Sequence, residues 1–198
     1  MSQPHFDLVG RPYDESIALK DVLQAGYGKK ASQNNLKQAG YNLDKELSNH
    51  NQQIFYNKEK KHLIFNVAGT HNLNDVGTDF LLGIGKLKSS NRYKSAKKSL
   101  TKAKQKYEDS NVDVVGHSLG GAIAQYVGSK NDHVTTFNKG ATIGQKTRKN
   151  EVAYRTKNDP VSLLVANSKR VHIIKNRSKN KGLIGAHSTD SLDNSIIL

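Results

Sequence analysis

The sequence contains no cysteine and only three prolines in 198 residues. The absence of cysteine excludes disulfides, a thiolate nucleophile and any cysteine-ligated zinc or iron–sulfur centre. No apolar run approaches the roughly 20 residues that a transmembrane helix requires. The N-terminal stretch MSQPHFDLVGRPYDES has no basic region followed by an apolar one, so no signal peptide is visible. We therefore expect a soluble protein located in the cytoplasm or, if the protein is viral, in the virus particle.

Acidic residues are also scarce: 17 Asp and Glu stand against 31 Lys and Arg, which gives a formal net charge of +14. Such an excess usually indicates nucleic acid or anionic lipid as a partner. However, the basic residues are 25 Lys and only 6 Arg, and there are 19 Asn. Lysine and asparagine have A-rich codons, so the A+T-rich genome of a microbe, parasite or virus would produce this bias. Arginine binds phosphates and base edges better than lysine does, and it is scarce in this chain, so nucleic acid is disfavoured as a partner. Contact with an anionic membrane stays open.

The length predicts one domain over residues 1–198, with a helical N-terminal segment at 1–40 packing on it. Apolar periodicity and breaker residues predict helices over 14–25, 75–88, 92–108 and 119–129. Ser32 is the candidate N-cap of a further short helix through Leu36 and Ala39. Strands are predicted over 52–57, 62–68, 112–116, 133–138, 151–156 and 170–176.

The order of these elements predicts an α/β fold. Only the polar sequence KEKK separates the strands at 52–57 and 62–68, which favours an antiparallel hairpin. After this hairpin, strands alternate with helices or long crossovers, a pattern typical of parallel sheets with helices on both faces. We expect a mostly parallel central sheet that becomes mixed through the N-terminal hairpin.

The strongest candidate for chemistry is the sequence GHSLGG at residues 116–121, between a predicted strand and a predicted helix. A nucleophile elbow places a serine at such a turn, with its Oγ exposed above the sheet. The tight turn and the close approach of helix to strand require glycine two residues on either side of Ser118. The backbone N–H of Leu119 would then point to a developing oxyanion. The alternative is a glycine-rich turn that merely closes a strand.

A serine nucleophile needs a base, and on this type of sheet the base comes last along the chain. Three histidines follow Ser118, namely His133, His172 and His187. His133 begins a strand, at the wrong edge of the sheet, and His172 lies inside a predicted strand. His187 lies in a predicted loop at 182–188 with room to reach Ser118. We therefore predict that His187 is the base.

The acid that orients the base must lie between the serine and the histidine in this chain order. Only Asp132, Glu151 and Asp159 do so. Asp132 and Glu151 precede their strands, whereas Asp159 follows its strand at the edge where ligands bind in α/β sheets. The order and the edge geometry therefore select Asp159.

A second oxyanion donor should come from a loop after an earlier strand. Gly69 and Thr70 directly follow the predicted strand at 62–68, so Thr70 offers its N–H and its hydroxyl. The alternative is an ordinary glycine at the end of a strand.

Four segments resemble the class 3 (fungal-type) lipases of the α/β-hydrolase superfamily, over roughly residues 40 to 195. They are NVAGT at 66–70, DVVGHSLGGAIAQY at 113–126, NDP at 158–160 and AHSTDSL at 186–192. The resemblance implies an α/β-hydrolase fold, a triad of Ser118, Asp159 and His187, and an oxyanion hole from Thr70 and Leu119. Members of that family usually carry an aromatic residue or arginine where this chain has Ala68.

These residues predict acyl transfer to water on a lipid ester, as in an acylglycerol lipase or esterase, with no metal and no organic cofactor. Two alternatives stay open: a phospholipase acting on anionic phospholipid, and a non-catalytic basic binding or particle-associated protein on a hydrolase scaffold. The sequence FLLGIGKL at 80–87 could form an acyl-binding wall or a lid, or simply pack on the sheet. The oligomeric state is not predicted.

Overall fold

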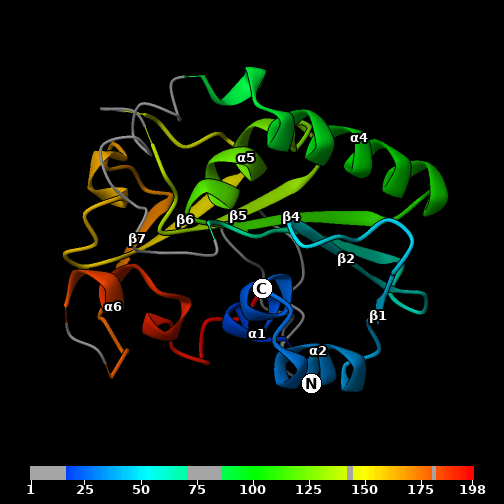
Figure 1. The fold of residues 1–198 in the computed structure, drawn as a ribbon, viewed down its shortest axis with the longest axis horizontal. Helices are drawn as coiled ribbons and strands as arrows, with labels where there is room; N and C mark the ends of the chain where they lie inside the picture. The colour runs from blue at the N-terminus through cyan, green and yellow to red at the C-terminus, as the bar shows by residue number, and fades with distance from the viewer. Residues whose placement is uncertain (1–16, 71–85, 142–144, 180–181) are drawn as a thin grey trace, which may run out of the picture.

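The computed structural model describes residues 17–70, 86–141, 145–179 and 182–198, and it is built on one mixed sheet (Figure 1). The sheet has seven strands in the order β1-β2-β3-β4-β5-β6-β7. Strands β1 to β3 are antiparallel, and β3 to β7 are parallel. The strands are β1 (Asn42–Leu43), β2 (Gln52–Asn57), β3 (His62–Val67), β4 (Asn111–His117), β5 (His133–Phe137), β6 (Glu151–Thr156) and β7 (Val171–Ile174). The predicted α/β class and the N-terminal hairpin are confirmed, and the two-residue β1 was not predicted.

Helices cover both faces of this sheet, as Figure 1 shows. Helices α4 and α5 lie on one face, and α1 and α2 lie on the other. The α-helices are α1 (Leu19–Gly26), α2 (Lys30–Gln38), α4 (Asn91–Lys106), α5 (Leu119–Val127) and α6 (Leu183–His187). Short 3₁₀ turns are η2 (Leu87–Ser89), η3 (Ser162–Leu164) and η4 (Thr189–Ser191).

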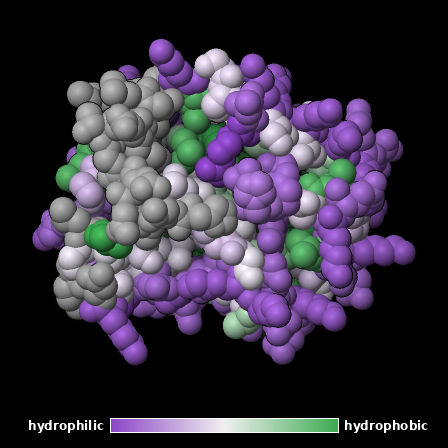
Figure 2. Space-filling model, in the orientation of Figure 1, coloured by the Kyte–Doolittle hydropathy of each residue, from purple (hydrophilic) through white to green (hydrophobic). Residues whose placement is uncertain are grey.

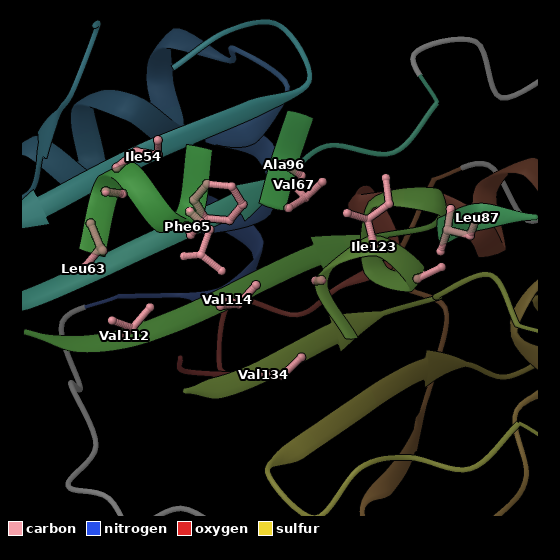
Figure 3. Close-up of a cluster of buried hydrophobic side chains, with 14 residues drawn as sticks. Ile54, Leu63, Phe65, Val67, Leu87, Ala96, Val112, Val114, Ile123 and Val134 are labelled. Atoms are coloured by element: carbon pink, nitrogen blue, oxygen red, sulfur yellow. The ribbon is translucent and has the colours of Figure 1, made fainter. Parts of the chain in front are cut away.

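The sheet separates two apolar cores, because successive side chains of a strand point to opposite faces. In β3, Phe65 belongs to the core beneath α4 and α5, which Figure 3 shows, whereas Ile64 belongs to the core beside α1. In β4, Val114 and Val115 divide in the same way. The central strands are therefore apolar on both faces, as a covered parallel sheet requires.

The C-terminal residues complete the core beside α1. Leu19 N donates to Ile196 O at 2.8 Å, and Leu198 N donates to Ile17 O at 3.1 Å. Leu192 and Leu198 are buried in the same core as α1. The two ends of the described chain therefore lie side by side at α1.

Two local predictions are wrong. Ser32 does not cap α2, because the helix begins two residues earlier, at Lys30, and Ser32 is buried inside it with its hydroxyl 3.4 Å from Gln24 Oε1. The predicted loop at 182–188 contains α6, where Ala186 N donates to Gly182 O at 3.0 Å. A single helical turn is too short to produce an apolar period, so the sequence pattern does not reveal it.

The predicted helices at 92–108 and 119–129 correspond to α4 and α5, and the hydroxyl of Ser90 caps α4 by accepting from Tyr93 N at 3.2 Å. The predicted helix at 75–88 lies largely outside the described residues, as does the segment 80–87 considered as a wall or lid. Leu87, in η2, is buried against the core beneath α4.

Hydrophilic side chains cover most of the described surface in the view of Figure 2. Among the residues that the structure describes, no helix is long and apolar enough to cross a membrane.

Candidate active site

The turn between β4 and α5 holds the backbone of Ser118 in a conformation that few residues other than glycine adopt. Its backbone φ is 56° and its ψ is −125°, a sparsely populated region that costs of the order of 1–3 kcal/mol. Neighbouring backbone fixes the turn: Ser118 N donates to Phe137 O at 3.1 Å, and Gly140 N donates to Ser118 O at 3.0 Å. The end of β5 therefore stabilises the strained turn, and strain of this kind is typical of functional sites.

The glycines around Ser118 let α5 approach the sheet. A Cβ at Gly116 would lie 2.4 Å from the carbonyl oxygen of Gly120, and a Cβ at Gly120 would lie 2.1 Å from the carbonyl oxygen of Val67. Both distances are far below a van der Waals contact, and the obstacle is rigid backbone in each case. The spacing of glycines in the motif is therefore a steric requirement of this strand–helix junction.

Three polar side chains from distant parts of the chain form a continuous hydrogen-bonded series. His187 Nε2 lies 2.8 Å from Ser118 Oγ, and His187 Nδ1 lies 2.8 Å from Asp159 Oδ1. Ser118 stands between β4 and α5, Asp159 follows β6, and His187 ends α6. All three are buried, with exposed fractions of 0%, 0% and 3%, so the expectation that the hydroxyl of Ser118 is exposed above the sheet is wrong. The structure thus brings together the residues selected from chain order.

Asp159 is held as a carboxylate. Burial alone raises its pKa, but the hydrogen bond and charge of His187, together with the hydrogen bond from the backbone N–H of Ser162, outweigh burial and keep the pKa below its usual value. Ser162 N donates to Asp159 Oδ2 at 2.9 Å. The other carboxylate oxygen, Oδ1, faces the imidazole and also accepts a longer hydrogen bond from Val161 N, at 3.4 Å.

The two other acids between Ser118 and His187 are engaged elsewhere. Asp132 lies 2.5 Å from Lys104 Nζ and accepts from Ser129 N at 2.6 Å. Glu151 forms a buried ion pair with Lys139. Asp132 precedes β5 and Glu151 begins β6, and each carboxylate is paired with a lysine, whereas Asp159 is the carboxylate that meets His187.

The two other histidines after Ser118 are also placed away from it. His133 begins β5, in register with the third residue of β4, so it lies toward the opposite end of the strands. His172 lies within β7, and its ring is 5.2 Å from the ring of Tyr154. His187 is the histidine whose ring reaches Ser118.

Of the two predicted oxyanion donors, Leu119 directly follows the serine, and Thr70 follows a glycine that lies against the serine turn. Leu119 is the first residue of α5, and Thr70 follows Gly69, whose backbone comes close to the turn. A Cβ at Gly69 would lie 2.9 Å from Ser118 Cβ and 2.7 Å from His117 O. The strand end before Thr70 therefore lies directly against the serine turn.

Three residues beside the triad, Arg92, Tyr27 and His117, carry no signal in the sequence that marks them as part of the site. The Arg92 guanidinium, at the start of α4, donates to Ala68 O at 2.6 Å, and burial lowers its pKa. Arg92 thus contacts the backbone at the position where class 3 lipases usually carry an aromatic residue or arginine. Tyr27 and His117 form hydrogen bonds to Gly69 and His187, described below.

Metal ligation has no visible basis in the part of the chain that is described. There, no group of three or more His, Asp or Glu side chains is arranged to hold a metal ion. His187 instead contacts Asp159 through Nδ1 and Ser118 through Nε2.

Solved structures share this architecture. The chain resembles Lip2 lipase from Yarrowia lipolytica with a TM-score of 0.53 and 16% identity, covering 73% of this chain and 70% of that one. It resembles MDLA from Penicillium cyclopium, determined as a mutant, with a TM-score of 0.51 and 17% identity, covering 83% and 78% of the two chains. Identities this low show the fold alone, which is that of the lipase-type α/β-hydrolases.

The fold is therefore that of the α/β-hydrolases. More particularly, a family model described as a Tle-like phospholipase domain matches residues 13–182, and the chain belongs to that phospholipase-like family. It is an ester-hydrolysing serine hydrolase. A comparison with curated proteins finds no match.

Proposed function

We propose that Ser118, His187 and Asp159 are the catalytic triad of a phospholipase that cleaves the acyl ester bonds of phospholipid through an acyl-enzyme. The observation that carries this proposal is the series of two 2.8 Å hydrogen bonds from Ser118 Oγ through His187 to Asp159. A chain of nucleophile, base and orienting acid in this geometry is the arrangement that activates a serine.

In the first step, Ser118 Oγ attacks the ester carbonyl carbon while His187 Nε2 takes the hydroxyl proton. Asp159 accepts the Nδ1–H of the imidazole, which fixes the tautomer and stabilises the imidazolium. The tetrahedral intermediate then expels the alcohol, which receives the proton from His187. Water, deprotonated by the same imidazole, then attacks the acyl-Ser118 ester. The second tetrahedral intermediate releases the fatty acid, and the imidazolium returns the proton to Ser118 Oγ.

The backbone N–H groups of Leu119 and Thr70 receive the oxyanion in this proposal. Leu119 begins α5, where the amide groups of a helix N-terminus point outward. Loss of one such donor typically costs about a hundredfold or more in rate.

Membership of the Tle-like family favours phospholipid as the substrate. The likeness to fungal lipases supports acylglycerols as the second candidate, since the same triad would cleave either acyl ester. A purely binding protein has no need of a base and an acid aligned on the serine, so the hydrogen-bonded series argues against that alternative.

Hydrolysis of phospholipid vesicles and of an emulsified triacylglycerol should be measured with the wild type and with Ser118→Ala. We expect fatty acid release from phospholipid by the wild type, and a loss of at least about a thousandfold in the variant. Ser32→Ala is the matched control, because it removes another buried hydroxyl, in α2 on the face of the sheet opposite α5. Release from triacylglycerol alone would make acylglycerol the substrate, and release from neither would contradict the proposal.

A further inference from the structure

A second hydrogen-bonded series runs beneath the triad. Gly69 N donates to Tyr27 Oη at 2.8 Å, and Tyr27 Oη lies 2.7 Å from His117 Nδ1. His117 Nε2 lies 2.7 Å from His187 O. The series therefore begins at the residue before Thr70 and ends on the backbone of the catalytic base.

The direction of every proton in this series follows from its two ends. The N–H of Gly69 can only donate, so the hydroxyl of Tyr27 accepts there and donates to His117 Nδ1. The carbonyl of His187 can only accept, so His117 carries its proton on Nε2. Burial, reinforced by the neighbouring His187, lowers the pKa of His117 to about 3, and burial raises the pKa of Tyr27. Both groups stay neutral at physiological pH, with every donor facing an acceptor.

Packing holds the His117 ring in this orientation. The ring is 2% exposed, stacks on Phe137 with centroids 5.6 Å apart, and lies 4.9 Å from the ring of His187. The ring of Tyr27 meets it edge-on at 5.8 Å. A ring enclosed in this way transmits a displacement at one nitrogen to the other.

We propose that Tyr27 and His117 are positioning residues. They hold Gly69, which precedes the proposed oxyanion donor Thr70, at a fixed position relative to the backbone of His187. The inference rests on the proposed function, because it concerns the alignment of that triad. Because Tyr27 directly follows α1, the inference gives that helix a part in aligning the triad.

Other hydrogen bonds also hold each end of the series. Loss of the series should therefore alter the alignment of the two ends and leave each end attached to the fold. Asn138 Nδ2 also donates to His187 O, at 3.1 Å, and to Ala186 O, at 2.8 Å. Arg92 independently donates to Ala68 O. Removing the Tyr27 hydroxyl would therefore leave both segments attached but no longer tied to each other.

The test is steady-state hydrolysis of a soluble p-nitrophenyl ester, together with the rate of fluorophosphonate labelling at Ser118. Tyr27→Phe should lower kcat and the labelling rate by about tenfold and leave KM within about twofold, because misplacement of a catalytic group affects the transition state rather than binding. His117→Phe should behave alike. The double variant should be no slower than the slower single variant, because both substitutions interrupt one series.

Tyr41→Phe is the matched control. Tyr41 Oη lies 2.6 Å from His62 Nδ1, and His62 Nε2 lies 2.8 Å from Asp113, so the same kind of tyrosine–histidine bond occurs away from the triad. Its loss should lower the melting temperature as Tyr27→Phe does and leave kcat unchanged. An equal loss of kcat in Tyr41→Phe would show a general effect of destabilisation and overturn the inference.

The remaining outcomes separate this inference from the proposed function. An active wild type whose Tyr27→Phe and His117→Phe variants keep kcat within twofold, or whose effects multiply, overturns only the inference. A wild type that neither hydrolyses ester nor accepts the label overturns the proposed function. If Tyr27→Phe does not fold, imidazole ¹⁵N NMR of the wild type decides: a proton on His117 Nε2 supports the series, and one on Nδ1 overturns it.

Discussion

Replacing Asp159 by asparagine should abolish most activity while changing the shape of the site very little. In the wild type, one carboxylate oxygen accepts from His187 Nδ1 at 2.8 Å and the other accepts from Ser162 N at 2.9 Å. An asparagine side chain offers one accepting oxygen and one donating NH₂ group in the same space. One of the two partners must therefore face a donor.

The two orientations of that amide have different costs. If the oxygen turns to His187, the NH₂ group of the introduced asparagine opposes the buried N–H of Ser162, which costs about 1–3 kcal/mol. If the oxygen stays on Ser162 N, the NH₂ group donates to His187 Nδ1 and forces the ring proton onto Nε2. The imidazole then donates to Ser118 Oγ and cannot remove its proton. We expect the second orientation, and a fall in kcat of about 10⁴-fold, equivalent to about 5 kcal/mol.

Asp132→Asn provides the comparison. Asp132 is also a buried carboxylate that accepts from a backbone N–H, that of Ser129, and it pairs with Lys104 away from the triad. Steady-state kinetics and thermal melting of both variants should give opposite patterns: Asp132→Asn loses melting temperature and keeps kcat, and Asp159→Asn loses kcat. If Asp159→Asn retains more than a tenth of wild-type kcat, the reasoning about tautomer and acceptor is refuted.

Three further predictions concern stability and charge. Gly120→Ala should lower the free energy of unfolding in urea by more than about 3 kcal/mol or prevent folding, because its Cβ would lie 2.1 Å from Val67 O; a loss below about 1 kcal/mol would contradict the packing argument. His117 stays neutral in the folded state until its pKa of about 3, whereas the unfolded chain binds a proton below about pH 6.5. Its contribution to stability is therefore present above about pH 6.5 and declines by about 3 kcal/mol between about pH 6.5 and pH 4, and urea titrations of His117→Phe should lack that part of the decline. If the basic charge is only compositional, co-sedimentation with anionic vesicles should be weak and insensitive to salt; strong binding that collapses at high salt would instead favour an anionic membrane surface.

The nucleophile turn could be predicted from the sequence because its requirements are local. A strand, a tight turn and a close-packed helix need Gly116, Gly120 and a small side chain at fixed spacing, and this leaves a readable pattern. The choice of Asp159 and His187 depended on chain order and on the edge of a parallel sheet, which are properties of the fold class.

Tyr27 and Arg92 could not be predicted in the same way. Tyr27 meets His117 across 90 positions of sequence, and Arg92 contacts backbone carbonyls rather than a side chain. A contact with backbone imposes no residue type on its partner, so no motif records it. The one-turn helix α6 and the two-residue strand β1 could not be predicted for another reason, because neither is long enough to show a hydrophobic period in the sequence.

Because the sheet divides the interior into two cores, the distance between Ser118 and His187 depends on how each core is packed. Ser118 precedes α5, whose Ile123 packs in the core beneath α4, whereas the segment after His187 is anchored by Leu192 in the core beside α1. A small change in the packing of either core would shift Ser118 relative to His187 before it unfolds the chain. We therefore expect a substitution in either core to lower kcat before it lowers the melting temperature, so that kcat reports on the alignment of the two cores.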